Sequence, residues 1–201
     1  MPTITDATLL RELYGQPVGR ALKKQLSRFE RHSRRFVELS PFCLLATSDA
    51  EGRADVTPRG GPAGFVRILD DQHLLLPDWP GNNRLDSLLN ILANPEVGLL
   101  FLIPGVDESL RVNGRAEIRT DPEFLDYYVD QGRLPRTVLH VEAREIYLHC
   151  GKALMRSALW QARVERSVLP SMGQMLKDQI AGLEHAETQA EMLERYRQTL
   201  Y

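Results

Sequence analysis

The segment Pro77–Asp86, which reads PDWPGNNRLD, stands between two different hydrophobic patterns. The apolar run just before it, His73–Leu76, predicts a β-strand. From Leu85 onward, four leucines recur at the spacing of one helix face: Leu85, Leu88, Leu89 and Leu92. The segment is therefore expected to lead from a strand, through a turn at Gly81, into a helix.

The turn before this helix has the composition of an anion site. A helix N-terminus presents unpaired N–H groups and a partial positive charge. Asn82 and Asn83 add amide groups, and Arg84 adds a guanidinium. A cation in the first helical turn opposes the helix dipole, and a bound phosphate would explain it. The alternative is that Asn83 only caps the helix, with Asp86 as its capping-box partner.

Short apolar runs broken by turn residues continue on both sides of this segment, which is typical of a β-barrel or sandwich. They predict six or seven mostly antiparallel strands, among them Phe42–Thr47, Arg53–Thr57, Phe65–Leu69, His73–Leu76, Val97–Ile103, Leu110–Ile118 and Arg136–His149. Further helices are expected over Val18–Leu39, from Pro122 to Val129, after Gly151, and over Glu184–Leu200. The fold class is mainly β with flanking helices.

No linker of Ser, Gly and Pro divides the 201 residues, so one domain is expected. Residues 1–40 form its helical N-terminal extension, residues 41–165 its barrel, and residues 166–201 a C-terminal helical extension packed on the same domain.

The composition, with 43% hydrophobic and 26% charged residues and a net charge of −2, is that of a soluble globular protein. It gives no reason to expect nucleic acid or a membrane as a partner. With no signal-like N-terminus and two distant cysteines, Cys43 and Cys150, a cytoplasmic location is expected. The five histidines show no metal-ligand spacing, so no metal site is expected.

Three more segments carry groups that could meet an anionic ligand. The glycine- and proline-rich stretch Asp55–Gly64 surrounds Arg59 and is expected to be a loop between strands. Alternation in Leu110–Arg115 puts Arg111 on one polar strand face together with Asn113 and Arg115. Lys152 and Arg156 share one helical face. The alternative for each segment is ordinary solvated surface, which is the commoner role for a polar strand face such as that of Arg111.

Together these motifs resemble the FMN-binding split-barrel superfamily of pyridoxamine 5′-phosphate oxidase, over about residues 40–165. The stretches that carry the resemblance occur in the family's order: GNNRLDS at 81–87, NP at 94–95, VGLLF at 97–101 and LRVNG at 110–114. TPRGG at 57–61 and HCGKA at 149–153 resemble more closely a subgroup of FMN-dependent enzymes with no assigned substrate. The resemblance implies a split, Greek-key-like antiparallel barrel that binds FMN at a homodimer interface.

The resemblance also implies roles for single residues. Asn82, Asn83 and Arg84 fall where the family places its phosphate-binding stretch, although this chain lacks the lysine there. The strand end that usually meets the ribityl chain or ring corresponds to Leu76, Pro77 and Asp78. Arg59 lies on the strand and loop that reach the flavin from below. Ser109 and Arg111 lie on a strand that approaches the cofactor, often from the partner subunit.

Lys152 and Arg156 are included as cofactor-binding candidates, although they have no secure equivalent in the oxidase itself. The oxidase's C-terminal substrate motif (Trp, then Arg-Leu) is missing from this chain, which argues against oxidation of pyridoxamine phosphate. The function expected is that of an FMN-dependent oxidoreductase, in which NADH or NADPH could be the electron donor to a small-molecule substrate. The alternatives are a non-catalytic FMN-binding protein for storage or sensing, and a split barrel that binds haem or a deazaflavin.

Overall fold

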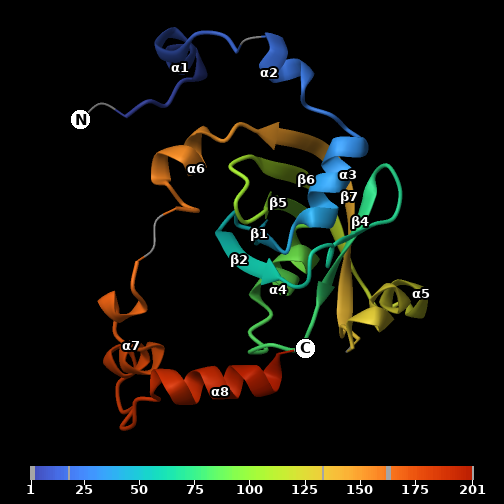
Figure 1. Ribbon diagram of the computed structural model, residues 1–201. Coiled ribbons are helices and arrows are strands. Elements are labelled where there is room, and N and C mark those ends of the chain that lie inside the picture. The colour runs from blue at the N-terminus through green and yellow to red at the C-terminus, as the bar shows by residue number, and fades with distance from the viewer. Residues whose placement is uncertain (1–2, 18, 133, 162–163, 201) are drawn as a thin grey trace.

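The computed structural model describes residues 3–17, 19–132, 134–161 and 164–200. Seven strands form a single antiparallel sheet in the order β2-β1-β5-β6-β7-β4-β3 (Figure 1). Their bounds are β1 Phe42–Ser48, β2 Ala54–Gly60, β3 Arg67–Ile68, β4 His73–Asp78, β5 Glu96–Leu102, β6 Ser109–Arg119 and β7 Thr137–His149. The expected split-barrel fold with flanking helices is confirmed, and the sheet is curved but not closed.

Helices precede, interrupt and follow this sheet. They are α1 Ala7–Tyr14, α2 Gly19–Lys23, α3 Arg31–Leu39, α4 Asp86–Ala93, α5 Pro122–Leu125, α6 Lys152–Ser157, α7 Met172–Gln179 and α8 Gln189–Thr199. Two 3₁₀ turns, η1 Asp126–Gln131 and η2 Arg166–Val168, complete the elements. Figure 1 shows α1 and α2 on one side of the sheet and the pair α7–α8 on another, with α8 leading back toward the loop before α4.

The core lies between the concave face of the sheet and the helices that cover it. Its members are mostly strand residues that alternate with more exposed ones, as in β1, where Cys43 and Leu45 are fully buried. Tyr128 of η1 is fully buried too, and its hydroxyl donates to the carbonyl of Leu75 at 3.0 Å. The strands predicted from the sequence therefore supply most of the core, with strand ends displaced by one to three residues in most strands.

The N-terminal helix prediction over Val18–Leu39 is wrong in its middle. Val18 itself lies outside the described residues, and the chain leaves helical structure between α2 and α3. Leu26 instead forms an isolated antiparallel bridge with Ile146 of β7. A backbone N–H and C=O that pair with a strand cannot also serve a helix, so the tertiary contact interrupts it.

The loop predicted around Arg59 is also wrong, because β2 continues to Gly60 and Arg59 projects from a strand. Pro58 lacks a backbone N–H, which would break a central strand. The proline is tolerated here because β2 is an end strand of the sheet and pairs only with β1, where Pro58 lies opposite Leu44.

Candidate functional site

The turn between β4 and α4 differs from the sequence-based prediction at its key residue. Asn83 and Leu85 adopt left-handed backbone angles, with φ of 59° and 62°. Helix α4 therefore begins at Asp86, with Leu85 as its N-cap. Arg84 precedes the helix instead of lying in its first turn, and its Nε donates to the Asp86 carboxylate at 2.8 Å. The prediction that Arg84 opposes the helix dipole from the first turn is thus wrong.

The capping alternative is wrong as well. No side-chain hydrogen bond caps α4 in the described part of the chain. The Asn82 side chain accepts a hydrogen bond from the backbone N–H of Arg84 at 3.1 Å, which stabilises the turn and not the helix. The first N–H groups of α4 therefore remain available to another acceptor.

The N-terminus of α4 opens into a pocket of about 230 Å³, which we call the β2–α4 pocket. Its walls come from β2, the end of β4, the turn and α4, and the lining residues are Thr57, Arg59, Asp78, Asn82, Arg84, Leu85, Asp86, Ser87 and Leu88. Four of the predicted cofactor residues, Arg59, Asp78, Asn82 and Arg84, are thus brought together from segments that the sequence separates.

Arg59 is the least exposed cation of this pocket. Its guanidinium pairs through Nη1 with Asp78, and both side chains are largely buried. Its Nε atom is buried and has no hydrogen-bond partner among the described residues. A buried donor without a partner costs free energy, and an acceptor placed in the pocket would remove that cost.

Two hydroxyl groups in this pocket were not predicted as site residues. Thr57 Oγ1 and Ser87 Oγ lie 3.2 Å apart, and Ser87 Oγ lies 3.4 Å from an Asp55 carboxylate oxygen. Thr57 could have been found from its spacing, because it stands two residues before Arg59 and so shares its strand face. Ser87 could have been found from its place in the first turn of the predicted helix.

The charges of this pocket balance almost completely. Arg59 is matched by Asp78, and Arg84 by Asp86. An anion would therefore be held mainly by directed donors, namely the N–H groups of α4, the hydroxyls of Thr57 and Ser87 and the Arg59 side chain. This donor set fits a phosphate group. The volume is below the roughly 300–1,000 Å³ of pockets that enclose a whole drug-sized ligand, so the rest of an FMN molecule would extend outside it.

The other predicted cofactor residues lie elsewhere in the chain. Leu76 and Pro77 are buried in β4, just after Leu74 and Leu75, which pair with β3. The backbone of Leu76 and Pro77 is therefore not paired with β3. Asn83 lies in the turn. Ser109 is buried on β6, and Lys152 and Arg156 are exposed on α6; none of the three lines the β2–α4 pocket.

Arg111 lines a different pocket of about 380 Å³ on the outer face of the sheet, which we call the sheet-face pocket. The floor is apolar and comes from β1, β2 and β5, and the lining residues are Leu44, Ala46, Val56, Gly98, Leu99, Leu100, Arg111, Asn113 and His149. Because side chains alternate along β2, Val56 faces this pocket while Thr57 and Arg59 face the β2–α4 pocket. The end strand β2 thus separates the two pockets.

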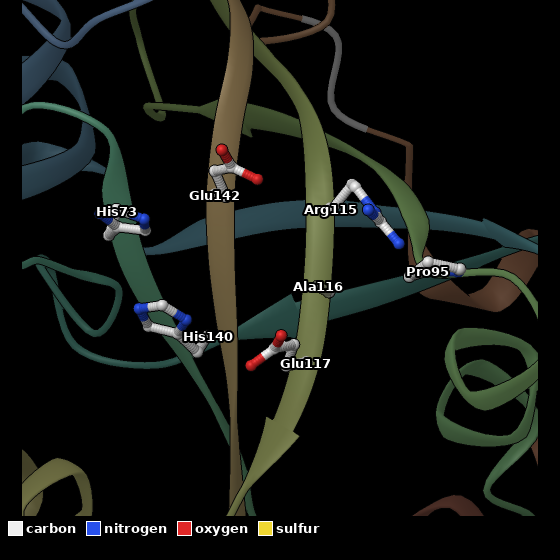
Figure 2. A pocket seen from close by; sticks show the side chains of 7 residues that line it. All are labelled: His73, Pro95, Arg115, Ala116, Glu117, His140 and Glu142. Carbon is white, nitrogen blue, oxygen red and sulfur yellow. The ribbon is translucent and has the colours of Figure 1, made fainter.

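A third pocket, of about 200 Å³, lies across β4, β7 and β6 (Figure 2). Figure 2 shows His73 of β4 beside His140 of β7, with Glu142 also on β7 and Arg115 and Glu117 together on β6. The rings of His73 and His140 stack with centroids 5.0 Å apart. The Phe124 ring also stacks on His140, with centroids 5.4 Å apart. The described residues contain no group of three or more His, Cys, Asp or Glu side chains arranged to hold a metal ion.

The half-buried His140 makes stability depend on pH. Burial lowers the pKa of His140 below its ordinary value, and the nearby His73 and Arg119 lower it further, against smaller opposing effects of Glu117 and Asp70. The unfolded chain therefore takes up this proton first as the pH falls through about 6.5. The free energy of unfolding is expected to decrease from neutral pH downward.

Replacing His140 with Gln removes this titration, so the fall in unfolding free energy between pH 7 and pH 5 should become shallower. Urea unfolding at several pH values measures it. An unchanged slope in the His140 variant would refute the assignment.

No described helix combines the length and the apolar character that a bilayer span requires. No curated protein matches the chain at a significant level. Among solved structures, a histidine-to-alanine variant of HupZ from Group A Streptococcus superposes with a TM-score of 0.50 at 18% identity, covering 60% of this chain and 98% of its own. This likeness shows a shared fold.

Two further structures superpose less well. The protein Rv2991 from Mycobacterium tuberculosis gives a TM-score of 0.47 at 20% identity, over 70% of this chain and 94% of its own. A FAD-binding protein from Mesorhizobium loti gives 0.40 at 16% identity, over 61% of this chain and 97% of its own. The sequence model of the family described as pyridoxamine 5′-phosphate oxidase matches residues 29–150, which is more than half of the chain and includes every strand. The chain therefore belongs to the pyridoxamine 5′-phosphate oxidase family.

Proposed function

We propose that this protein binds FMN, with the phosphate in the β2–α4 pocket, and acts as an oxidoreductase on a small molecule. The observation that carries the proposal is the uncapped N-terminus of α4 beside the buried, unpartnered Nε of Arg59. Both groups are donors, and Arg59 and the first turn of α4 line the same pocket. Family membership supports the same cofactor class, since the sequence motifs that resemble the family include this turn.

Each pocket residue has a role in this proposal. The Arg59 side chain and the α4 N–H groups would donate to the phosphate oxygens, and the Thr57 and Ser87 hydroxyls would add neutral donors. Arg84, whose side chain is 73% exposed, would contact the phosphate from the mouth of the pocket. The bound FMN would supply the redox chemistry by taking up hydride equivalents from a donor and passing them on.

The phosphate assignment is tested with Arg84→Ala and two ligands. FMN affinity should fall about 10- to 100-fold, near 1.5–3 kcal/mol, while riboflavin, which has no phosphate, should bind both proteins equally. The thermal midpoint of the protein without ligand should hardly change, because exposed ion pairs contribute little. Fluorescence titration and thermal melts measure these quantities.

Arg53→Ala is the matched control for this experiment. Arg53 is also exposed and ion-paired, to Asp49 at 2.6 Å, but it lies in the turn between β1 and β2. Its variant should bind FMN as the wild type does. Equal losses of FMN and riboflavin affinity in the Arg84 variant would place the phosphate elsewhere.

Turnover is tested with the FMN-loaded protein and nicotinamide donors. NADH or NADPH should bleach the oxidised flavin absorption, and admission of air should restore it. Matched free FMN at the same concentrations gives the background rate. If the bound flavin keeps its oxidised spectrum with both donors, the oxidoreductase part of the proposal is wrong and FMN binding without turnover remains.

We further propose that the protein is a homodimer that uses the outer face of the sheet. The floor of the sheet-face pocket is apolar, and Val56 on it is 58% exposed. An apolar face of this kind favours a protein partner, and self-association with two-fold symmetry is the commonest arrangement. The face also carries Arg111, so a second copy that packs there would lie close to this arginine.

The dimer proposal is tested by Val56→Glu, which places a charge in the apolar face. This variant should sediment as a monomer at micromolar concentration and bind FMN at least tenfold more weakly. Val129→Glu is the control, since Val129 is 63% exposed but lies on η1, away from this face. A Val56 variant that remains dimeric, or a monomer with full FMN affinity, would contradict the proposal.

A further inference from the structure

The segment Lys24–Leu26 joins the sheet from outside the region that the family match covers, which begins at residue 29. The N–H of Leu26 donates to the Ile146 carbonyl at 2.9 Å, and the N–H of Ile146 donates to the Leu26 carbonyl at 2.7 Å. Strand β4 pairs with β7 only as far as Glu142. The N-terminal segment thus extends the sheet beside the part of β7 that β4 does not reach.

This pairing places two side chains of the segment against β7. Lys24 Nζ donates to the Leu148 carbonyl at 2.8 Å and lies 4.2 Å from the centre of the Tyr147 ring. Gln25 Nε2 donates to a Glu145 carboxylate oxygen at 3.0 Å. Lys24 and Gln25 are otherwise exposed, so the Leu26–Ile146 backbone pair is what keeps them here.

Glu145 in turn holds Arg111. Its second carboxylate oxygen accepts from Arg111 Nη2, and also from Asn113 Nδ2 at 3.2 Å. The guanidinium carbon of Arg111 lies 5.1 Å from the centre of the Tyr147 ring. The Nε of Arg111 is buried without a hydrogen-bond partner among the described residues. A continuous chain of contacts therefore runs from Gln25 through Glu145 to a donor that still lacks an acceptor.

The charges at this end of the sheet-face pocket are unbalanced. Lys24 and Arg111 stand against one carboxylate, Glu145. Burial lowers the pKa of His149, and Arg111 and Lys24 lower it further, which favours the neutral imidazole. Of the described residues that line the pocket, Arg111 alone is an arginine, lysine, aspartate or glutamate. A positive charge beside an apolar floor suits a flat ligand with an electron-rich edge.

We propose that Lys24 and Gln25 are positioning residues for the ring system of FMN: Gln25 fixes Glu145, Glu145 fixes Arg111, and Lys24 adds a second positive charge beside it. The inference rests on the proposed function and adds the N-terminal extension to the cofactor site. It concerns the ring and not the phosphate, because the phosphate donors face the opposite side of β2.

The experiment uses Lys24→Met and Gln25→Ala in the full chain, titrated with FMN and with riboflavin. Each variant should weaken both ligands about three- to tenfold and leave the ratio of the two affinities unchanged. Lys24→Arg should restore wild-type affinity, because a guanidinium also lies well over an aromatic ring. Glu142→Gln is the control. Glu142 also lies on β7, but it lines the separate pocket that contains His73 and His140 (Figure 2).

The midpoint potential of the bound flavin gives a second measurement that a purely structural role would not move. Loss of the Lys24 charge should disfavour the more negative, reduced flavin up to tenfold relative to the oxidised one, which lowers the potential by up to about 30 mV. Thermal melts of the variants without ligand verify that each is folded.

The outcomes separate this inference from the proposed function. If the wild type prefers FMN to riboflavin but Lys24→Met and Gln25→Ala bind both ligands as the wild type does, the inference is wrong and the proposed function stands. A loss of FMN affinity alone would assign Lys24 to the phosphate and also overturn the inference. If the wild type binds neither flavin, both fail together.

Discussion

Gly114 lies so close to the Glu142 carbonyl that a Cβ at this position would be 2.0 Å from the oxygen. The contact occurs at the register shift between Asn113 and Gly114, within the long ladder that joins β6 and β7. Any side chain here would push the two strands apart, so glycine maintains the bulge and the bend that accompanies it. The bulge divides the ladder into two halves with different surroundings.

The two halves of the ladder carry different chemistry. On one side of the bulge, Arg111 lines the sheet-face pocket and pairs across the ladder with Tyr147, and the N-terminal segment joins β7 there. On the other side, β7 pairs with β4 instead and the stacked histidines line a separate pocket. The same two strands thus support a basic, partly apolar surface and a surface of mixed charge, without a change in secondary structure.

Much of the fold and part of the site could be predicted from the residue pattern. Short apolar runs broken by turn residues predicted the strands, and the leucine spacing predicted α4, because burial of one helix face imposes that period. The prediction that Arg59 and the turn before α4 belong to one site came from the family resemblance, because no local sequence pattern places β2 beside that turn. Backbone angles in the turn were not predictable, and they decide that Arg84 lies before the helix and pairs with Asp86.

What the sequence by itself determined is most of the elements and part of the donor set: the strands, a helix after the turn at Gly81, and the arginines and amides beside them. Only the tertiary structure decided which donors share a pocket. The Thr57 and Ser87 hydroxyls are hydrogen-bonded although they are thirty residues apart in the sequence. Gln25 is hydrogen-bonded to Glu145, which is 120 residues away. Such contacts depend on strand order and register, which a local pattern does not encode, because hydrophobic burial selects faces and not partners.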